Sequence, residues 1–213
     1  MANDGGGGDH GHKLDRIDVK GLILDMFIAG TDTIYKSIEW TMAELIKNPA
    51  EMAKVQSEVR HVAAAANGDE DDDAVAVVRE EQLGKMTLLR AAMKEAMRLH
   101  PPLPLLIPRE AIQGTVLHGH RVAAGTRVMI NAWAIGRDEA AWEGAAEFRP
   151  GRRGCPGMAF ATRLAELAVA NMACWFEWEL PDGQDVESFE VVESSGLSPG
   201  LINPLVLAAK PLK

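Results

Sequence analysis

The chain has 213 residues, 47% of them hydrophobic, which is enough for one or two domains with a buried core. Its formal net charge is −9, and no cluster of lysines and arginines marks a phosphate-binding surface, which argues against nucleic acid as a partner. Two cysteines are too few for a disulfide framework. With no secretory signal and no apolar run near the ~18 residues of a membrane span, they predict a reduced, cytosolic location without a membrane span.

The first part of the chain predicts two helices behind a disordered lead-in. Residues 1–15 are rich in glycine and histidine, which is typical of disorder. A helical pattern runs from about Ile17 to Lys47, and its first half is apolar nearly all round, which predicts burial inside a larger body. Asn48-Pro49 ends it, and a second helix is expected from about Pro49 to Ala65. The acidic run 69–73 is typical of a solvated loop rather than a metal site.

The middle of the chain predicts a third helix and a hairpin. The helix is expected from about Arg79 or Lys85 to Leu99, where a His-Pro-Pro sequence stops it. Four prolines predict extended backbone over residues 101–108. Alternating residues and two glycines from Ile112 to Asn131 predict short strands and a hairpin, and a loop rich in tryptophan, glutamate and alanine is expected to lead from there to Pro150.

The last part predicts a tight loop at residues 151–157, an amphipathic helix from about Met158 to Trp175, and a tail of short strands and turns. Cys174, inside the apolar helix pattern, is interpreted as a core residue. The fold class predicted for the whole chain is therefore mainly helical with small β hairpins (α+β).

The loop Gly151-Arg152-Arg153-Gly154-Cys155-Pro156-Gly157 is the strongest chemical motif. Cys155 stands just before a predicted helix, where backbone N–H groups and the helix dipole favour the thiolate that binds metals. The flanking glycines leave room for a flat macrocycle, and Arg153 is placed to pair with an anion such as a haem propionate. The alternative is a helix start with an incidental cysteine.

Two further motifs lie on helices. Ala29-Gly30-Thr31-Asp32-Thr33 places polar groups in an apolar helix, which indicates either a widened turn with a proton-relaying hydroxyl or a polar packing kink. Glu95 and Arg98 have the i,i+3 spacing of an ion pair, which is also common on exposed helices. The histidine pairs at 10 and 12 and at 118 and 120 have no carboxylate or cysteine partners and are interpreted as surface residues rather than metal ligands.

In this order the motifs resemble the cytochrome P450 family, most closely its large plant microsomal group. The resemblance starts at Asp25 to Thr33 and continues through Lys94 to Pro102 and Pro108 to Glu110. It ends with the Cys155 loop and the region around Gly196 and Leu197. Residues 16–213 are therefore interpreted as one partial cytochrome P450 domain, with a truncated fold built on the long helix, the haem loop and the helix after it.

The resemblance implies a monooxygenase that inserts one atom of O2 into a small apolar substrate, with haem b (iron protoporphyrin IX) as cofactor and electrons from NADPH through a reductase. Cys155 would be the axial ligand of the haem iron, and Thr33, assisted by Asp32, would deliver protons. Glu95 and Arg98 match two members of the family's structural Glu-Arg-Arg triad. The remaining implied assignments are cofactor contacts at Arg109, Phe148, Gly151, Arg153 and Gly157, and pocket positions at Ala29, Leu105, Leu106 and Leu197.

The chain also departs from the family pattern. At less than half the length of a typical member, it is expected to lack the membrane anchor and the helices that roof the pocket. Phe148-Arg149-Pro150 runs directly into Gly151, so a segment is expected to be missing between residues 150 and 151, and the triad's second arginine has no counterpart. The long apolar helix is then expected to lack its cover, which predicts aggregation or a partner.

Three functions stay open from the sequence. The first is the monooxygenase, which in the parent family lies on the cytosolic face of the endoplasmic reticulum; without an anchor, this chain is expected in the cytoplasm. The second is an inactive truncated remnant of such an enzyme. The third is a haem-free helical interaction module that uses the apolar residues from Leu22 to Ile28.

Overall fold

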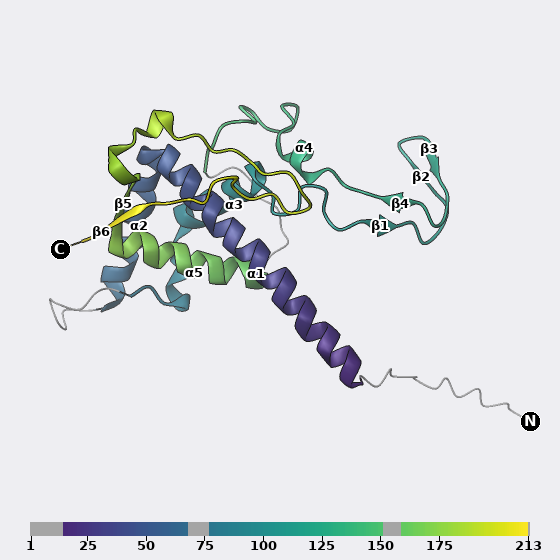
Figure 1. The fold of residues 1–213 in the computed structure, drawn as a ribbon, viewed down its shortest axis with the longest axis horizontal. Helices are drawn as coiled ribbons and strands as arrows, with labels where there is room; N and C mark the ends of the chain where they lie inside the picture. The colour runs from purple at the N-terminus through teal and green to yellow at the C-terminus, as the bar shows by residue number, and fades with distance from the viewer. Residues whose placement is uncertain (1–14, 68–76, 151–158, 213) are drawn as a thin grey trace, which may run out of the picture.

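The computed structural model describes residues 15–67, 77–150 and 159–212. The elements, in the order of Figure 1, comprise helices, short 3-10 helices and paired strands. The helices are α1 (Arg16–Lys47), α2 (Pro49–Asn67), α3 (Thr87–Leu99), α4 (Ala132–Gly136) and α5 (Ala159–Trp175), with 3-10 helices η1 (Glu80–Lys85), η2 (Pro181–Gly183) and η3 (Val186–Ser188). The strands are β1 (Arg109–Glu110), β2 (Thr115–Leu117), β3 (His120–Val122), β4 (Arg127–Val128), β5 (Phe176–Glu179) and β6 (Ala208–Pro211). The prediction of a mainly helical protein with small hairpins is confirmed.

The core lies among four helices: the C-terminal half of α1, α2, α3 and α5 (Figure 1). Buried aliphatic side chains from each helix meet there, as helices with one apolar face require. Cys174 is among them, so its interpretation as a core residue is confirmed, and burial raises the pKa of its thiol. Fully buried members of the core include Met42, Leu45, Val55, Val59, Met86, Leu89, Met93 and Val169.

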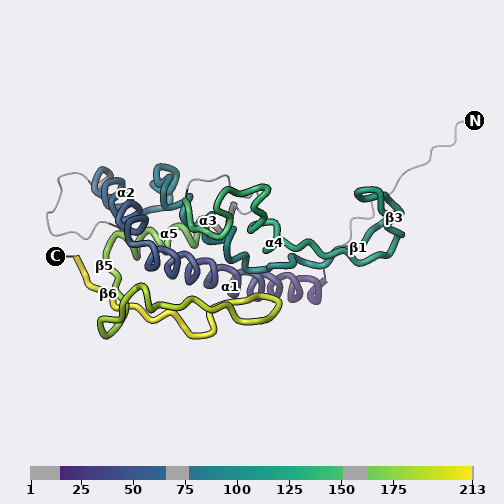
Figure 2. The backbone as a smooth tube through the Cα atoms, turned by 90° about the horizontal axis from the view of Figure 1, so that it is seen from above, coloured from purple at the N-terminus to yellow at the C-terminus, as the bar shows by residue number. Residues whose placement is uncertain are grey.

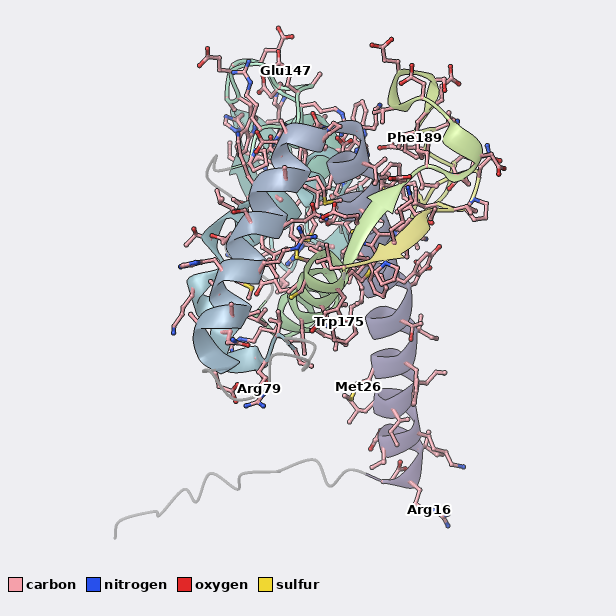
Figure 3. The ribbon with its side chains drawn as sticks, turned by 90° about the vertical axis from the view of Figure 1, so that its left-hand side faces the viewer. Arg16, Met26, Arg79, Glu147, Trp175 and Phe189 are labelled. Atoms are coloured by element: carbon pink, nitrogen blue, oxygen red, sulfur yellow. The ribbon has the colours of Figure 1, made fainter. Side chains whose placement is uncertain are left out.

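The N-terminal half of α1 projects out of this helical body (Figures 1 and 3). Asp15 caps its start by accepting hydrogen bonds from the backbone N–H groups of Ile17 and Asp18. The apolar side chains beyond the cap are exposed, with 73% of Met26 and 69% of Phe27 accessible. The prediction that this half of the helix is buried is therefore wrong for the described residues. The prediction that it exposes an apolar surface is confirmed.

Three antiparallel strand pairs complete the fold: β1 with β4, β2 with β3, and β5 with β6. The predicted hairpin is the β2–β3 pair, which extends away from the helical body (Figure 1). Its turn places His118 and Gly119 at φ values of 47° and 83°, the left-handed backbone of a tight hairpin turn. No group of three or more histidine, cysteine or carboxylate side chains suited to a metal occurs among the described residues.

Two predictions of local structure were wrong. Residues 101–108 are not extended throughout: the N–H of Leu106 donates to the carbonyl of Leu103 at 3.1 Å, and Leu106 has a φ of 52°. The prolines fix their own φ but leave a turn open between them. The segment after β4 was expected to be a loop, yet it contains the short helix α4, started by the side chain of Asn131, which accepts from the N–H of Ala134.

The C-terminal segment after β5 runs alongside α1, as the yellow part of the tube in Figure 2 shows. It holds one isolated bridge, between Glu193 and Leu201, and returns to pair β6 with β5. Within residues 15–67, 77–150 and 159–212, none of the helices combines the length and the hydropathy of a membrane span.

Candidate active site

The segment from Ala29 to Thr33 lies where α1 leaves the helical body. The helix stays α-helical across it, so the widened turn considered from the sequence is absent. The hydroxyl of Thr33 donates to the carbonyl of Ala29 at 2.6 Å, the back-bonding that short hydroxyl side chains make inside helices. Ala29 is exposed, and a Cβ built on Gly30 would have no neighbour within 4 Å among the residues that the structure describes. The geometry is that of a regular helix with an open face.

Asp32 is not free on this face. Its carboxylate accepts from the ammonium of Lys36 at 2.9 Å, one turn later in the same helix. A hydrogen bond from the side chain of Ser198, and secondly one from Lys36, hold the pKa of Asp32 below its usual value. Ser198 follows Leu197, so the structure brings the part of the C-terminal segment next to Leu197, which is predicted to border the pocket, close to the polar turn of α1. Asp32 is therefore an ionised anchor for the C-terminal segment.

Glu95 and Arg98 form the predicted ion pair, and both side chains are buried. Two guanidinium nitrogens of Arg98 donate to the two carboxylate oxygens of Glu95 at 2.9 and 2.8 Å. The exposed fractions are 6% for Arg98 and 3% for Glu95, so the alternative of a surface pair is wrong. A charge this deeply buried needs both a counter-charge and hydrogen bonds, and this two-point pairing supplies both.

The remaining donors of Arg98 hold the segment before the cysteine loop. Arg98 donates to the carbonyls of Gly136, Ala145 and Glu147, the last two at 2.7 and 3.0 Å. The backbone N–H of Arg149 completes the arrangement by donating to Glu95 at 2.9 Å. A main-chain group thus occupies a Glu95 oxygen, and the Arg149 side chain instead pairs with Glu147. The Glu95–Arg98 pair fixes residues 136–149 onto α3.

A second polar cluster surrounds His100, which directly follows α3. Its ring stacks on that of Trp40, with centroids 3.9 Å apart and planes within 4° of parallel. Its two nitrogens lie 2.5 Å from a carboxylate oxygen of Glu193 and 2.8 Å from one of Glu44. Burial alone would lower the pKa of His100, but the hydrogen bonds and charges of the two glutamates outweigh it and raise that pKa. The cluster joins α1, α3 and the C-terminal segment.

The predicted cofactor and pocket residues fall into two groups. Arg109 in β1 is exposed, as are Leu105 and Leu197, while Leu106 is half-buried and Phe148 packs against the core. No hydrogen bond or ion pair joins the described Arg109 to the α1 turn. Figure 1 shows β1 and the projecting half of α1 extending toward the same end of the molecule. Gly151, Arg153, Cys155 and Gly157 lie outside the described residues.

Comparison with known proteins shows which family the chain belongs to. The model of the family described as Cytochrome P450 matches residues 2–152, which is more than half of the chain. The chain belongs to the cytochrome P450 family. The matched region includes the Ala29–Thr33 turn and the Glu95–Arg98 pair, and it ends before Cys155. Family membership therefore does not depend on the cysteine loop.

Several curated relatives similar to this chain are plant proteins. The chain is 42% identical to norfluorocurarine oxidase from Strychnos sp. and to Cytochrome P450 71A1 from Persea americana, with 92% and 94% of the chain covered. It is 41% identical to psoralen synthase from Ammi majus over 95% of the chain. The matches cover 41%, 42% and 44% of these relatives, so the chain spans less than half of their length.

Solved structures show the same fold. The crystal structure of a cytochrome P450 (CYP102L1) superimposes with a TM-score of 0.77 at 24% identity, over 93% of this chain and 46% of that one. A cytochrome P450DA mutant heme domain gives the same TM-score at 20% identity. The mainly helical architecture is thus that of part of a cytochrome P450.

The described residues fit the haem that the family implies. The space over Gly30 allows a flat macrocycle to approach the α1 backbone, because no side chain of the described residues fills it. The exposed Arg109 forms no ion pair with other described residues and is available to a propionate. Exposed apolar side chains of α1, such as Phe27, provide a surface for the ring. Cys155, the thiolate expected for the iron, belongs to the undescribed loop.

Sequence reasoning missed the residues that connect the C-terminal segment to α1. Lys36 stands at i+4 from Asp32 in an apolar helix, so its pairing was detectable from the spacing. Ser198 and Glu193 gave no comparable signal, because they lie in an irregular segment far from their partners in the sequence. Glu44 falls one turn after Trp40, and only the folded chain shows that both contact His100.

Proposed function

We propose that this chain is the haem-binding part of a monooxygenase that inserts one atom of O2 into a small, largely apolar substrate. The observation that carries the proposal is the open α1 turn, where the hydroxyl of Thr33 and the carboxylate of Asp32 stand on an apolar helix. The plant oxidase and synthase among the relatives support a small organic substrate.

The residues of this chain would hold and serve the cofactor. Cys155 would bind the iron as thiolate, with Arg153 and Arg109 facing the propionates and with Gly151, Gly157 and Phe148 shaping the loop. Haem supplies the oxidation chemistry when bound. Ala29, Leu105, Leu106 and Leu197 would border the substrate, and their apolar side chains exclude water. Electrons would come from an NADPH-dependent reductase at the cytosolic face of the endoplasmic reticulum.

The decisive experiment measures haem ligation by Cys155. Reconstituted with haem, reduced and exposed to carbon monoxide, the chain is expected to show the red-shifted Soret band of thiolate-ligated iron, because only a thiolate donates enough electron density. In Cys155→Ala this band should disappear. In the control Cys174→Ala it should persist, because Cys174 is a core residue. Absence of haem uptake by the wild-type chain would end the proposal for this chain.

Thr33 would deliver protons from its Oγ1 atom. Its hydrogen bond to the Ala29 carbonyl is a neutral one, so leaving that bond costs only about 1 kcal/mol and the hydroxyl can turn to the open face. In a turnover-competent form, Thr33→Ala is expected to reduce product formed per O2 consumed about tenfold, whereas Thr33→Ser should retain most of the yield. The check is simultaneous measurement of O2 uptake and product; equal coupling in both variants would refute the role.

The second candidate function is that of an inactive remnant, which retains part of the cytochrome P450 fold but has no monooxygenase activity. The exposed apolar half of α1 favours it, because haem bound on an open face would be solvated. The match to norfluorocurarine oxidase extends over 219 positions while covering 92% of the 213 residues, so this chain lacks some positions that the relative has within the matched region. The haem-reconstitution experiment separates the two candidates. A monodisperse haem-free monomer would argue against the third, an interaction module at residues 22–28.

A further inference from the structure

Lys36 is a buried lysine whose ammonium contacts oxygens from two distant parts of the chain. Only 9% of its side chain is exposed. Its Nζ donates to Asp32 Oδ2 at 2.9 Å, to Ser198 Oγ at 3.0 Å and to the carbonyl of Ser198, which lies 162 residues away in sequence. An ammonium has three protons, so these three acceptors satisfy it completely.

The same contacts determine where the segment from Ser194 to Gly200 lies. Within it, the N–H of Ser194 donates to the carbonyl of Gly200 at 2.8 Å, and the N–H of Gly200 donates to the hydroxyl of Ser194 at 3.0 Å. These two hydrogen bonds close a loop that includes Leu197, whose side chain is 70% exposed. Gly200 packs on the stem of Lys36, because a Cβ there would lie 3.2 Å from Lys36 Cε.

We propose that Lys36 is a positioning residue that holds the loop from Ser194 to Gly200 against α1 and so keeps Leu197 beside the Ala29–Thr33 turn. Asp32 supplies the negative charge that makes the buried ammonium tolerable, and Ser198 supplies the acceptors on the loop. That Leu197 then shapes a substrate pocket rests on the proposed function. The holding of the loop does not, since every contact involved is within the chain itself.

The test is hydrogen exchange of the intact chain without haem, measured on peptides that cover residues 193–202. Charge-assisted hydrogen bonds typically resist opening more than neutral ones, so Lys36→Met is expected to accelerate exchange in this segment at least tenfold. Peptides from α2 should be unchanged. The matched control is Lys54→Met, because Lys54 forms an exposed pair with Glu51 on α2, and it should leave residues 193–202 as in the wild type.

A double-mutant cycle separates holding of the loop from a general loss of stability. Ser198→Ala removes the hydroxyl contact with Lys36 and keeps the carbonyl contact, so it is expected to accelerate exchange about threefold in the wild type. It should add less in Lys36→Met, where the hydroxyl contact is already absent. Unchanged exchange in a folded Lys36→Met chain, or acceleration spread evenly over all helices, would overturn the proposal. If Lys36→Met fails to fold, Ser198→Ala alone decides, since a wild-type rate there also overturns it. Failure to bind haem bears only on the proposed function.

Discussion

Replacing Arg98 with methionine is expected to lower the free energy of unfolding by about 3–5 kcal/mol. The change removes the guanidinium that pairs with the buried carboxylate of Glu95, to which the N–H of Arg149 still donates. It also removes the donors to the carbonyls of Gly136, Ala145 and Glu147. Urea unfolding followed by circular dichroism measures the effect. The free energy of unfolding of a domain is typically about 5–15 kcal/mol, so a loss of this size can leave the variant largely unfolded at 37 °C.

The double variant Arg98→Met with Glu95→Leu sharpens this prediction. If the loss comes mainly from the buried Glu95 charge that has lost Arg98, removing that charge should recover part of the stability. Lys54→Met is the control for loss of a surface pair and should change the free energy of unfolding by under about 1 kcal/mol. A loss of similar size in Arg98→Met and Lys54→Met would contradict the central role of the buried pair.

The helices could be predicted closely because each has a local cause. Asn48-Pro49 ends α1 at Lys47, and the His-Pro-Pro sequence after Leu99 ends α3 there, both as predicted. The alternative starts predicted for the third helix, Arg79 and Lys85, bracket the 3-10 helix η1, which comes before α3. The short helix α4 was missed because only the Asn131 cap and packing against α3 support it. The turn at Leu106 was missed because prolines restrict their own φ and leave the next residues free.

The site could be predicted less fully than the helices, for a different reason. The i,i+3 spacing predicted the Glu95–Arg98 ion pair from the sequence. That the pair is structural and not on the surface follows only from the burial of both side chains in the folded chain. The contacts of Lys36 with Ser198 join residues that no periodic pattern relates. Likewise, the exposure of Phe27 depends on which other segments cover α1, and a local pattern records only that the side chain is apolar.

Replacing His100 with glutamine is expected to lower the free energy of unfolding by about 2–3 kcal/mol near pH 6. The change removes the ring that stacks on Trp40 and leaves Glu44 and Glu193 without a cation between them. Arg137, 3.6 Å from Glu193, offsets only part of that charge. Urea unfolding at pH 6 measures the loss. His61→Gln, on the exposed face of α2, controls for loss of an imidazole and should cost under about 0.5 kcal/mol.

The pH dependence of this loss follows from the two shifted groups. Because the folded-state pKa of His100 is raised, its stabilisation is complete below the unfolded value of about 6.5 and disappears as pH rises through the folded pKa. The pKa of Glu193 is lowered, chiefly by its hydrogen bond with His100, so its contribution is present above about 4.3 and disappears as pH falls through the folded pKa. The stability difference between wild type and His100→Gln should therefore peak between these limits and decline on both sides. Unfolding curves from pH 3 to 9 measure it, and a difference independent of pH would show that stacking on Trp40, rather than charge, accounts for the stabilisation by His100.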